Sequence, residues 1–333
     1  MPLLVLSAAD VHRLLGYPDC VAVMRSGLGA LAAGQADQPL RVIIRPGGAP
    51  GLIGLMPAYL AADDDSGGPG AYGLKALTIT PGNPAAGLDA HQGIVLVSDG
   101  VTGVPLALLN ASAVTEIRTA AVSVLATDLL ARPGAADLAV IGTGVQARAH
   151  IRAFSQTREL RRIRVAGRDA ARAAKFAAEL QPEIPVPVTA CPSAADAVTG
   201  ADIIVTATSS AEPVLRRDWI SAGAHVNAVG ACLPAARELD AATVAAAALF
   251  CDSRAGLTSE AGDYLLAVAD GLAGPEVIRG ELGEVLAGAA PGRAADAEIT
   301  VFESLGLAVE DLAAALRVYE IAAAAGAGQW LEF

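Results

Sequence analysis

The sequence has 333 residues, of which 53% are hydrophobic and only 4% are aromatic, and its formal net charge is −12. This length suffices for two domains with large cores. The acidic balance argues against nucleic acid or an anionic membrane as a partner. The N-terminus lacks the basic start of a signal peptide and no apolar run approaches about 18 residues, so we expect a cytoplasmic protein. The four cysteines are far apart and form no C-x-x-C pair, which predicts neither a disulfide framework nor a metal site.

The N-terminal third combines helices with strand-like segments. A capping box at Ser7 and Asp10 predicts one helix, and a second is expected from about 19 to 33. A polar, glycine-rich surface loop is expected at 61–70. Strands are expected at 42–44, 52–56 (ending at Pro57), 72–80, 94–97 and 104–109. With no helices between them, these strands predict a largely antiparallel sheet covered by helices, an α+β arrangement.

Lys75 lies in the middle of the apolar segment YGLKALTIT. Lysine in a strand usually marks an edge or a face open to water. The alternative is a cation at the floor of a cleft. The strand alone does not decide between the two.

A long helix is expected from 113 to 131, capped by Ser112 and ended by Pro133 and Gly134. Its first turns carry Arg118 and Thr119. Arg118 faces either a cofactor crevice or water, and the pattern favours both equally.

The segment DLAVIGTGVQARAH, residues 137–150, predicts a strand, a tight turn and a helix N-terminus in succession. In a dinucleotide-binding turn the first glycine, here Gly142, allows the turn, and the second, Gly144, lets the backbone approach a pyrophosphate. Ala147 then permits close packing of helix on strand. The helix N-terminus holds the anion through its free N–H groups and dipole.

From residue 137 onward strands alternate with helices, which predicts a doubly wound parallel sheet of six strands. After Asp252 the pattern predicts only helices and turns, and the final helix, 306–325, is expected to return to the N-terminal domain. We therefore predict a Rossmann-type sheet inserted into an α+β domain. The predicted domains are 117–306 for dinucleotide binding, and 1–116 with 307–333 for substrate binding and dimerisation.

The second strand of the parallel sheet ends at Gly167 and is followed by Arg168 and Asp169. An acidic residue at this strand end binds the ribose 2′-hydroxyl of NAD, whereas an arginine can pair with the 2′-phosphate of NADP. With Arg168 in this place, NADPH is predicted as the cofactor. NADH stays possible, because Asp169 could contact a ribose hydroxyl.

Together these motifs resemble the ornithine cyclodeaminase/μ-crystallin family over nearly the whole chain. They include QPLR at 38–41, LMP at 55–57, Lys75, SDGVTGVPLA, RTAA at 118–121, IGTGVQA, NAVGA, REL at 237–239, GELGEVLAG and TVFESLGLAVED. The resemblance implies a homodimer, and Arg41 and Lys75 in the substrate pocket. It also implies a cofactor site formed by Arg118, Gly142, Thr143, Gly144, Val145, Gln146, Thr206 and Ser304. Thr119, Val229 and Arg168, the last from its place at the strand end, are further candidates for this site.

Two positions depart from the members that cyclise ornithine. Those members carry an aspartate two residues past the glycine of NAVG and a glutamate before LMP, where this chain has Cys232 and Gly54. Without these carboxylates a diamine finds no anion for its distal ammonium. The chain is more similar to the branch that reduces cyclic ketimines.

These observations predict an NAD(P)H-dependent reductase of cyclic ketimine carboxylates, such as Δ1-pyrroline-2-carboxylate or Δ1-piperideine-2-carboxylate. Arg41 and Lys75 would fix the carboxylate, and the proton would come from Lys75, water or Cys232. The alternatives are an ornithine cyclodeaminase, an alanine dehydrogenase-like enzyme, and a nucleotide-dependent binding protein without catalysis. We expect the nicotinamide ring to face Arg41 and Lys75.

Overall fold

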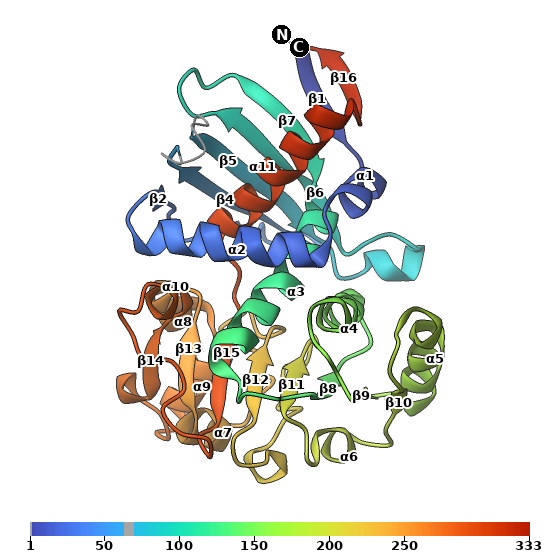
Figure 1. Cartoon of the computed structure of the whole chain (residues 1–333), viewed down its shortest axis with the longest axis vertical. Helices are drawn as coiled ribbons and strands as arrows, with labels where there is room; N and C mark the ends of the chain where they lie inside the picture. Colours follow the sequence, from blue (N-terminus) through green and yellow to red (C-terminus); the bar gives the residue numbers. More distant parts are fainter. Residues whose placement is uncertain (1, 63–69) are drawn as a thin grey trace. The chain divides into compact units, whose positions relative to one another are not determined.

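The computed structural model describes residues 2–62 and 70–333, which form two compact units, each with its own sheet (Figure 1). Unit 1 comprises Met1–Arg118 and Gly306–Phe333, and unit 2 comprises Thr119–Leu305. Helix α3 (Ala111–Leu130) contains one of the boundaries. The loop predicted at 61–70 lies almost entirely outside the described residues.

Sheet A of unit 1 has the strand order β16-β1-β7-β6-β5-β4-β2, and β3 pairs with β4. Its described pairs are antiparallel apart from β1 with β7, so the predicted sheet type is confirmed. Three of its strands, β1, β2 and β16, were not predicted. The strands are β1 (Pro2–Leu6), β2 (Ala36–Asp37), β3 (Val42–Ile44), β4 (Leu52–Leu60), β5 (Ala71–Ile79), β6 (His91–Asp99), β7 (Pro105–Asn110) and β16 (Gln329–Glu332).

Three helices of unit 1 are α1 (Ala8–Leu14), α2 (Tyr17–Ala32) and α11 (Ala308–Ala325). The predicted capping box is present, because Asp10 N donates to Ser7 Oγ and Ser7 N donates to the Asp10 carboxylate. Helix α11 packs on α2, β4 and β5 (Figure 1). The last helix therefore returns to the N-terminal part of the chain, and its first turn reaches the centre of sheet A.

Sheet B of unit 2 is parallel and has the order β10-β9-β8-β11-β12-β15-β13-β14. The chain runs outward from β8 in one direction and then from β11 in the other, so the strand order reverses between β8 and β11. The ends of strands at such a reversal are where ligands bind in α/β sheets. The strands are β8 (Asp137–Ile141), β9 (Arg162–Ala166), β10 (Val188–Ala190), β11 (Ile203–Thr206), β12 (His225–Ala228), β13 (Ala248–Cys251), β14 (Ile278–Glu281) and β15 (Thr300–Glu303).

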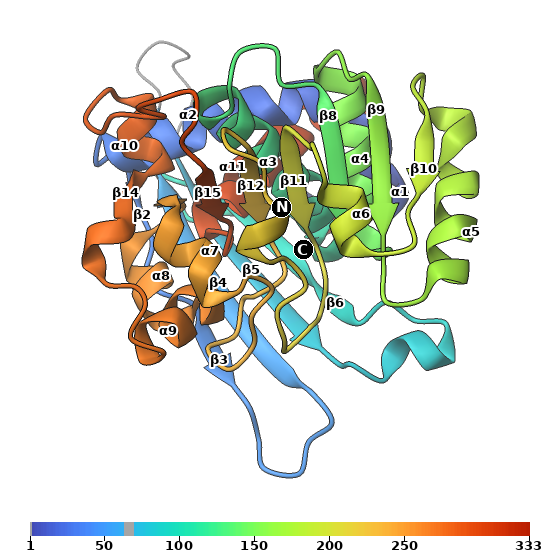
Figure 2. The same cartoon turned by 90° about the horizontal axis from the view of Figure 1, so that it is seen from below.

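Helices alternate with most strands of sheet B, and α4 packs on β8 and β11 (Figure 2). The predicted α/β fold with a Rossmann-type doubly wound sheet is confirmed. The helices that follow α3 in unit 2 are α4 (Val145–Thr157), α5 (Ala170–Leu180), α6 (Ala194–Val198), α7 (Ala241–Ala246), α8 (Arg254–Glu260), α9 (Gly262–Ala269) and α10 (Leu282–Leu286).

The prediction of six strands followed only by helices and turns was wrong, because β14 and β15 lie in that later region. Strand β15 pairs with β12 on one side and β13 on the other. Its four residues, TVFE, are all buried, so they show no alternation that would mark a strand. Their place in the sheet depends on partners remote in sequence.

Two local predictions in unit 1 were also wrong. Strand β4 continues through Pro57, which pairs with Leu74 on β5. On its other side β4 passes from β3 to β2 at this point, and no ladder partner is described there, so the missing N–H of proline is tolerated. Ser112 lies inside α3 and donates to the His91 carbonyl, whereas the side chain of Asn110 accepts from Ala113 N.

Candidate active site

Lys75 lies in the middle of β5, an inner strand, opposite Met56 of β4 and Val95 of β6. Its side chain is only 3% exposed, and its Nζ lies 2.5 Å from Asp311 Oδ2 on α11. The edge-strand explanation for this lysine is therefore wrong. Lys75 is a buried cation held against the first turn of the last helix.

Asp311 also joins Lys75 to Arg118. Its Oδ1 accepts from Arg118 Nε at 3.0 Å, and Arg118 Nη1 donates to Glu310 Oε2 at 2.7 Å. These four side chains are buried. Glu310 and Asp311 lie in the first turn of α11, where the helix dipole stabilises negative charge. The acids of one helix thus hold a lysine from the sheet and an arginine from α3.

Arg41 belongs to the same group, which we call the charged cluster: Arg41, Lys75, Arg118, Glu310 and Asp311. Arg41 Nη2 donates to the Gly306 carbonyl at 3.0 Å. Gly306 has φ +82°, and a Cβ added to it would lie 2.5 Å from Arg118 Nη1. The backbone of Gly306 therefore fits closely against one guanidinium and binds another. The formal charges of the charged cluster, three positive and two negative, sum to +1.

Burial lowers the pKa of Lys75 to about 8, with Asp311 opposing the shift and Arg118 and Arg41 adding to it. Burial acts to raise the pKa of Asp311, but Arg118 and Lys75 together hold it below its usual value. Both pKa values are lowered for reasons that are consistent. Asp311 has two cations beside it, which stabilise the carboxylate, whereas Lys75 is buried with one anion and two cations nearby, which disfavours the ammonium. Lys75 can therefore exchange its proton near neutral pH.

In unit 2 the predicted glycine turn joins β8 to α4. Gly142 has φ +133°, and a Cβ there would collide with the Ala207 carbonyl at the end of β11. Gly144 is the N-cap of α4 and has no heavy atom within 4 Å of an added Cβ, while the first helical residue, Val145, is 56% exposed. Close backbone packing at Gly142 and an open helix N-terminus after Gly144 fit a dinucleotide pyrophosphate.

Three other predicted cofactor residues lie at the carboxyl ends of neighbouring strands of the same sheet. Thr206 ends β11, Val229 follows β12 and Ser304 follows β15. Val229 N donates to Thr206 O at 3.0 Å, and Ser304 N donates to Ala228 O at 2.9 Å. The structure brings these residues to the carboxyl end of sheet B, where the turn with Thr143 and the first turn of α4 with Gln146 also lie. Thr119 is a buried residue of α3.

At the end of β9, Arg168 is exposed, and Asp169 caps α5 by accepting from Ala171 N and Arg172 N through one oxygen. Asp169 therefore has a structural role that explains an acid at this position. Arg168 is the side chain offered to solvent at the strand end where an adenosine ribose is bound in this fold.

Cys232, the third candidate catalytic residue, follows β12 and is half-buried, with its Sγ 3.5 Å from the Val229 carbonyl. In the same segment, Gly230 N donates to the carboxylate of Glu238 at 2.7 Å, and that carboxylate also accepts from Thr208 N at 2.6 Å. Glu238 thereby links the segments that follow β11 and β12 by hydrogen bonds.

Glu238, Glu310 and Asp311 were not predicted to belong to the site. The signals were present, since all three are acids within the quoted segments REL and TVFESLGLAVED. What marks these acids as site residues is that they are buried, and the burial of an acid cannot be predicted from its neighbours in the sequence.

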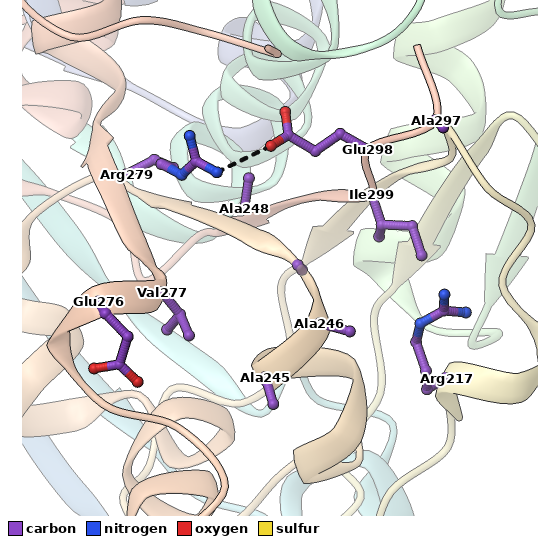
Figure 3. A pocket seen from close by; sticks show the side chains of 11 residues that line it. Arg217, Ala245, Ala246, Ala248, Glu276, Val277, Arg279, Ala297, Glu298 and Ile299 are labelled. Carbon is purple, nitrogen blue, oxygen red and sulfur yellow. Dashed lines mark hydrogen bonds and ion pairs between the residues drawn. The ribbon is translucent and has the colours of Figure 1, made fainter. Parts of the chain in front are cut away.

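A cavity of about 380 Å³ lies elsewhere in unit 2, at the amino ends of β13, β14 and β15 (Figure 3). Arg217, Glu276, Arg279 and Glu298 surround an apolar floor of alanine, valine and isoleucine side chains, and Arg279 pairs with Glu298 at 3.1 Å. None of the predicted site residues lines it. The cavity therefore lies at the amino ends of the strands of sheet B, whereas the glycine turn lies at their carboxyl ends.

Residues 2–62 and 70–333 contain no group of three or more His, Cys, Asp or Glu side chains arranged to hold a metal ion. In the same part of the chain, no helix has both the length and the apolar character needed to cross a bilayer.

The doubly wound sheet, its strand-order reversal and the glycine turn define a dinucleotide-binding α/β protein. The model of the ornithine cyclodeaminase/mu-crystallin family matches residues 2–326. The chain belongs to this family.

Three relatives illustrate the match. Ketimine reductase mu-crystallin of Mus musculus is 41% identical over 287 residues, which cover 86% of each chain. The structure of Thermococcus litoralis Δ1-pyrroline-2-carboxylate reductase in complex with NADH and L-proline is 36% identical, with a TM-score of 0.92 over 98% of this chain and 99% of that one. An archaeal alanine dehydrogenase dimer with bound NAD is 30% identical, with a TM-score of 0.92 over the whole of both chains.

Proposed function

We propose that this protein reduces cyclic ketimine carboxylates, Δ1-pyrroline-2-carboxylate or Δ1-piperideine-2-carboxylate, to proline or pipecolate. The chain is an oxidoreductase that acts on C=N bonds and uses a nicotinamide cofactor. The proposal concerns its substrate. The charged cluster carries the proposal, because its net charge of +1 matches a single carboxylate and is concentrated on side chains that bind carboxylates well.

In this proposal Arg41 and Lys75 bind the substrate carboxylate and orient the ring, and Arg118 supports Lys75 through Asp311. When bound, a reduced nicotinamide would supply the hydride for the carbon of the C=N bond. The ring nitrogen gains a proton, which Lys75, water or Cys232 provides, and the product is a secondary amine. A protonated imine is already electrophilic, so alignment and charge placement are sufficient contributions for the protein.

Gly54 supports a cyclic imine over ornithine. Gly54 and Met56 lie on the same face of β4, because they are two residues apart, and Met56 is opposite Lys75. A glutamate at position 54 would add a carboxylate to the face that carries Lys75, where glycine adds none. With glycine at position 54, the distal ammonium of ornithine would meet a charged cluster whose net charge is already positive.

The proposal is tested by following oxidation of NADPH and NADH with purified protein and a panel of substrates. We expect turnover with the two cyclic ketimine carboxylates. Ornithine, an amine, oxidises no reduced cofactor, so it is tested separately with NAD⁺ by ammonia release, and none is expected. Turnover only with pyruvate and ammonia would favour the alanine dehydrogenase-like alternative. Nucleotide binding without turnover on any imine or amino acid would favour the binding-protein alternative.

NADPH is proposed as the preferred cofactor because Arg168 is exposed at the end of β9 while Asp169 is engaged in capping α5. The Thermococcus litoralis relative holds NADH and the archaeal relative holds NAD. The proposed preference for NADPH over NADH therefore depends on Arg168 of this chain binding the 2′-phosphate.

Replacing Arg168 by alanine is expected to lower kcat/KM with NADPH by about 10–100-fold, the contribution of a charge-assisted hydrogen bond to phosphate. Values with NADH should stay within about twofold, since NADH has no 2′-phosphate. Arg162, an exposed arginine at the other end of the same strand that pairs with Asp137, provides the matched control R162A. Equal or better use of NADH by the wild type, with no effect of R168A on either cofactor, contradicts the proposal.

A homodimer is also proposed. All three residues of β3, Val42, Ile43 and Ile44, are between 44% and 49% exposed, which is unusual for a row of apolar side chains on a sheet. Such a surface fits contact with a second copy of the chain. Sedimentation equilibrium of the wild type distinguishes a dimer from a monomer.

A further inference from the structure

The Lys75–Asp311 pair offers an inference that rests on the proposed function and deepens it. Lys75 comes from the middle of sheet A and Asp311 from the first turn of α11, 236 residues later. Both side chains are buried, at 3% and 1% exposure, and their charged atoms are 2.5 Å apart. Burying an ammonium or a carboxylate costs free energy of desolvation, and a close ion pair such as this one offsets that cost.

The position of Asp311 is itself fixed. Arg118 Nε donates to its other oxygen at 3.0 Å, and Arg118 is held in turn by Glu310 at 2.7 Å. Asp311 therefore cannot turn away from Lys75 without losing a second buried ionic hydrogen bond. The carboxylate is both a counter-charge for Lys75 and a rigid support for its Nζ.

The titratable and polar groups near Lys75 come from α11, α3, the segment before β3, and β6, while the neighbouring strand β4 places the apolar Met56 opposite it. Asp311 of α11 supplies the negative charge. Arg118 of α3 and Arg41, which precedes β3, supply positive charges, and Thr115 of α3 lies 3.5 Å from Nζ. His91 of β6 is near enough for the charge of Lys75 to affect it. Among these groups Asp311 is the one that favours the ammonium over the free amine.

We infer that Asp311 is a positioning residue that keeps Lys75 as an ammonium and directs it at the substrate. Without Asp311, the two nearby guanidinium groups and burial would together favour the uncharged amine. An uncharged Lys75 can neither pair with a substrate carboxylate nor donate a proton to the ring nitrogen.

The amino-acid composition makes a direct test feasible, because the chain has only two lysines, Lys75 and Lys175. Protein labelled with ¹³Cε-lysine should give two side-chain signals, and Lys175, which is 80% exposed, serves as an internal reference. The variant K175R assigns the signals. The titration needs neither substrate nor turnover.

Replacing Asp311 by asparagine should move the titration of the Lys75 signal to lower pH by about 1–3 units, the size expected for loss of an adjacent opposite charge. The Lys175 signal should not move. The matched control is E310Q, which removes a charge from the next residue, whose carboxylate pairs with Arg118. A much smaller shift is expected for E310Q, and D311E should restore a titration close to that of the wild type.

The kinetic counterpart is the ratio of kcat/KM between D311N and the wild type, measured with one ketimine from pH 5 to 9. From a wild-type pKa of about 8 for Lys75, a shift of about 1–3 units predicts a ratio between about 0.5 and 0.01 at pH 7, and the ratio should rise as the pH falls, because acid restores the ammonium. Titration of the ketimine itself cancels in this ratio. Loss of folding alone would lower activity without this recovery.

An unchanged Lys75 titration in D311N, or an equal shift in E310Q, overturns the inference. If the wild type reduces no ketimine but Lys75 still shifts in D311N, the proposed function fails while the effect of Asp311 on Lys75 stands. Circular dichroism and thermal unfolding of each variant show whether it is folded. Should D311N fail to fold, the Lys75 signal of the wild type replaces it: an ammonium at pH 7 is expected, and a free amine at pH 7 would overturn the inference.

Discussion

Replacing Lys75 by alanine is expected to lower kcat/KM for a cyclic ketimine carboxylate by about 10²–10⁴-fold, the range found for loss of a positioned charged or proton-donating group. The substitution removes the cation proposed to bind the carboxylate. It also leaves Asp311 with Arg118 as its remaining ion-pair partner in the charged cluster. The rate of ketimine reduction at saturating cofactor provides the measurement.

The matched control for this prediction is K175A, which removes the other lysine, an exposed residue of α5. That variant should keep the activity of the wild type. Cofactor affinity, measured by fluorescence titration, should be unchanged in K75A, because Lys75 belongs to unit 1 and the proposed cofactor residues in the glycine turn belong to unit 2. A K75A enzyme with wild-type kcat/KM would remove the central element of the proposed mechanism.

The two glycines of the turn are expected to fail in different ways. Alanine at position 142 meets a φ of +133° and the carbonyl of Ala207, so G142A should destabilise the protein by about 1–3 kcal/mol or more. Alanine at position 144 meets open space in the protein, so G144A should leave stability unchanged. The cofactor affinity of G144A should nevertheless fall about 10–100-fold, because its methyl group occupies the approach of the pyrophosphate to the backbone.

Thermal unfolding without cofactor and isothermal titration with NADPH separate these outcomes. Each variant is the other's control, since the two substitutions add the same methyl group two residues apart. Full cofactor affinity in G144A would place the pyrophosphate elsewhere on the protein. Wild-type stability in G142A would mean that the turn relaxes without cost.

The elements that the sequence predicted best have locally determined geometry. The turn at Gly142 and Gly144 depends on consecutive residues, and β8, α4 and β9 follow it at the expected spacing. Repeated alternation of strands and helices then predicts a doubly wound sheet, since parallel strands require crossover connections. The family resemblance depended on short motifs of the same local kind.

Other elements could not be predicted in this way. Strand β15 is inserted between β12 and β13, although more than 45 residues separate its start from the end of β13. Pro57 is accommodated in β4 because the neighbouring strand changes at that point. In both cases the deciding partner is distant in sequence, and pairing of this kind leaves no local pattern.

The sequence by itself determined the parallel sheet, its glycine turn and the presence of a lysine in an apolar strand. Only the tertiary structure decided what that lysine is. A buried cation is stable only beside compensating charge, and the carboxylate of Asp311 reaches Lys75 because the last helix packs across the first sheet. Charge interactions act through space over a few ångströms, so the chemistry of Lys75 depends on how the chain's two ends pack together.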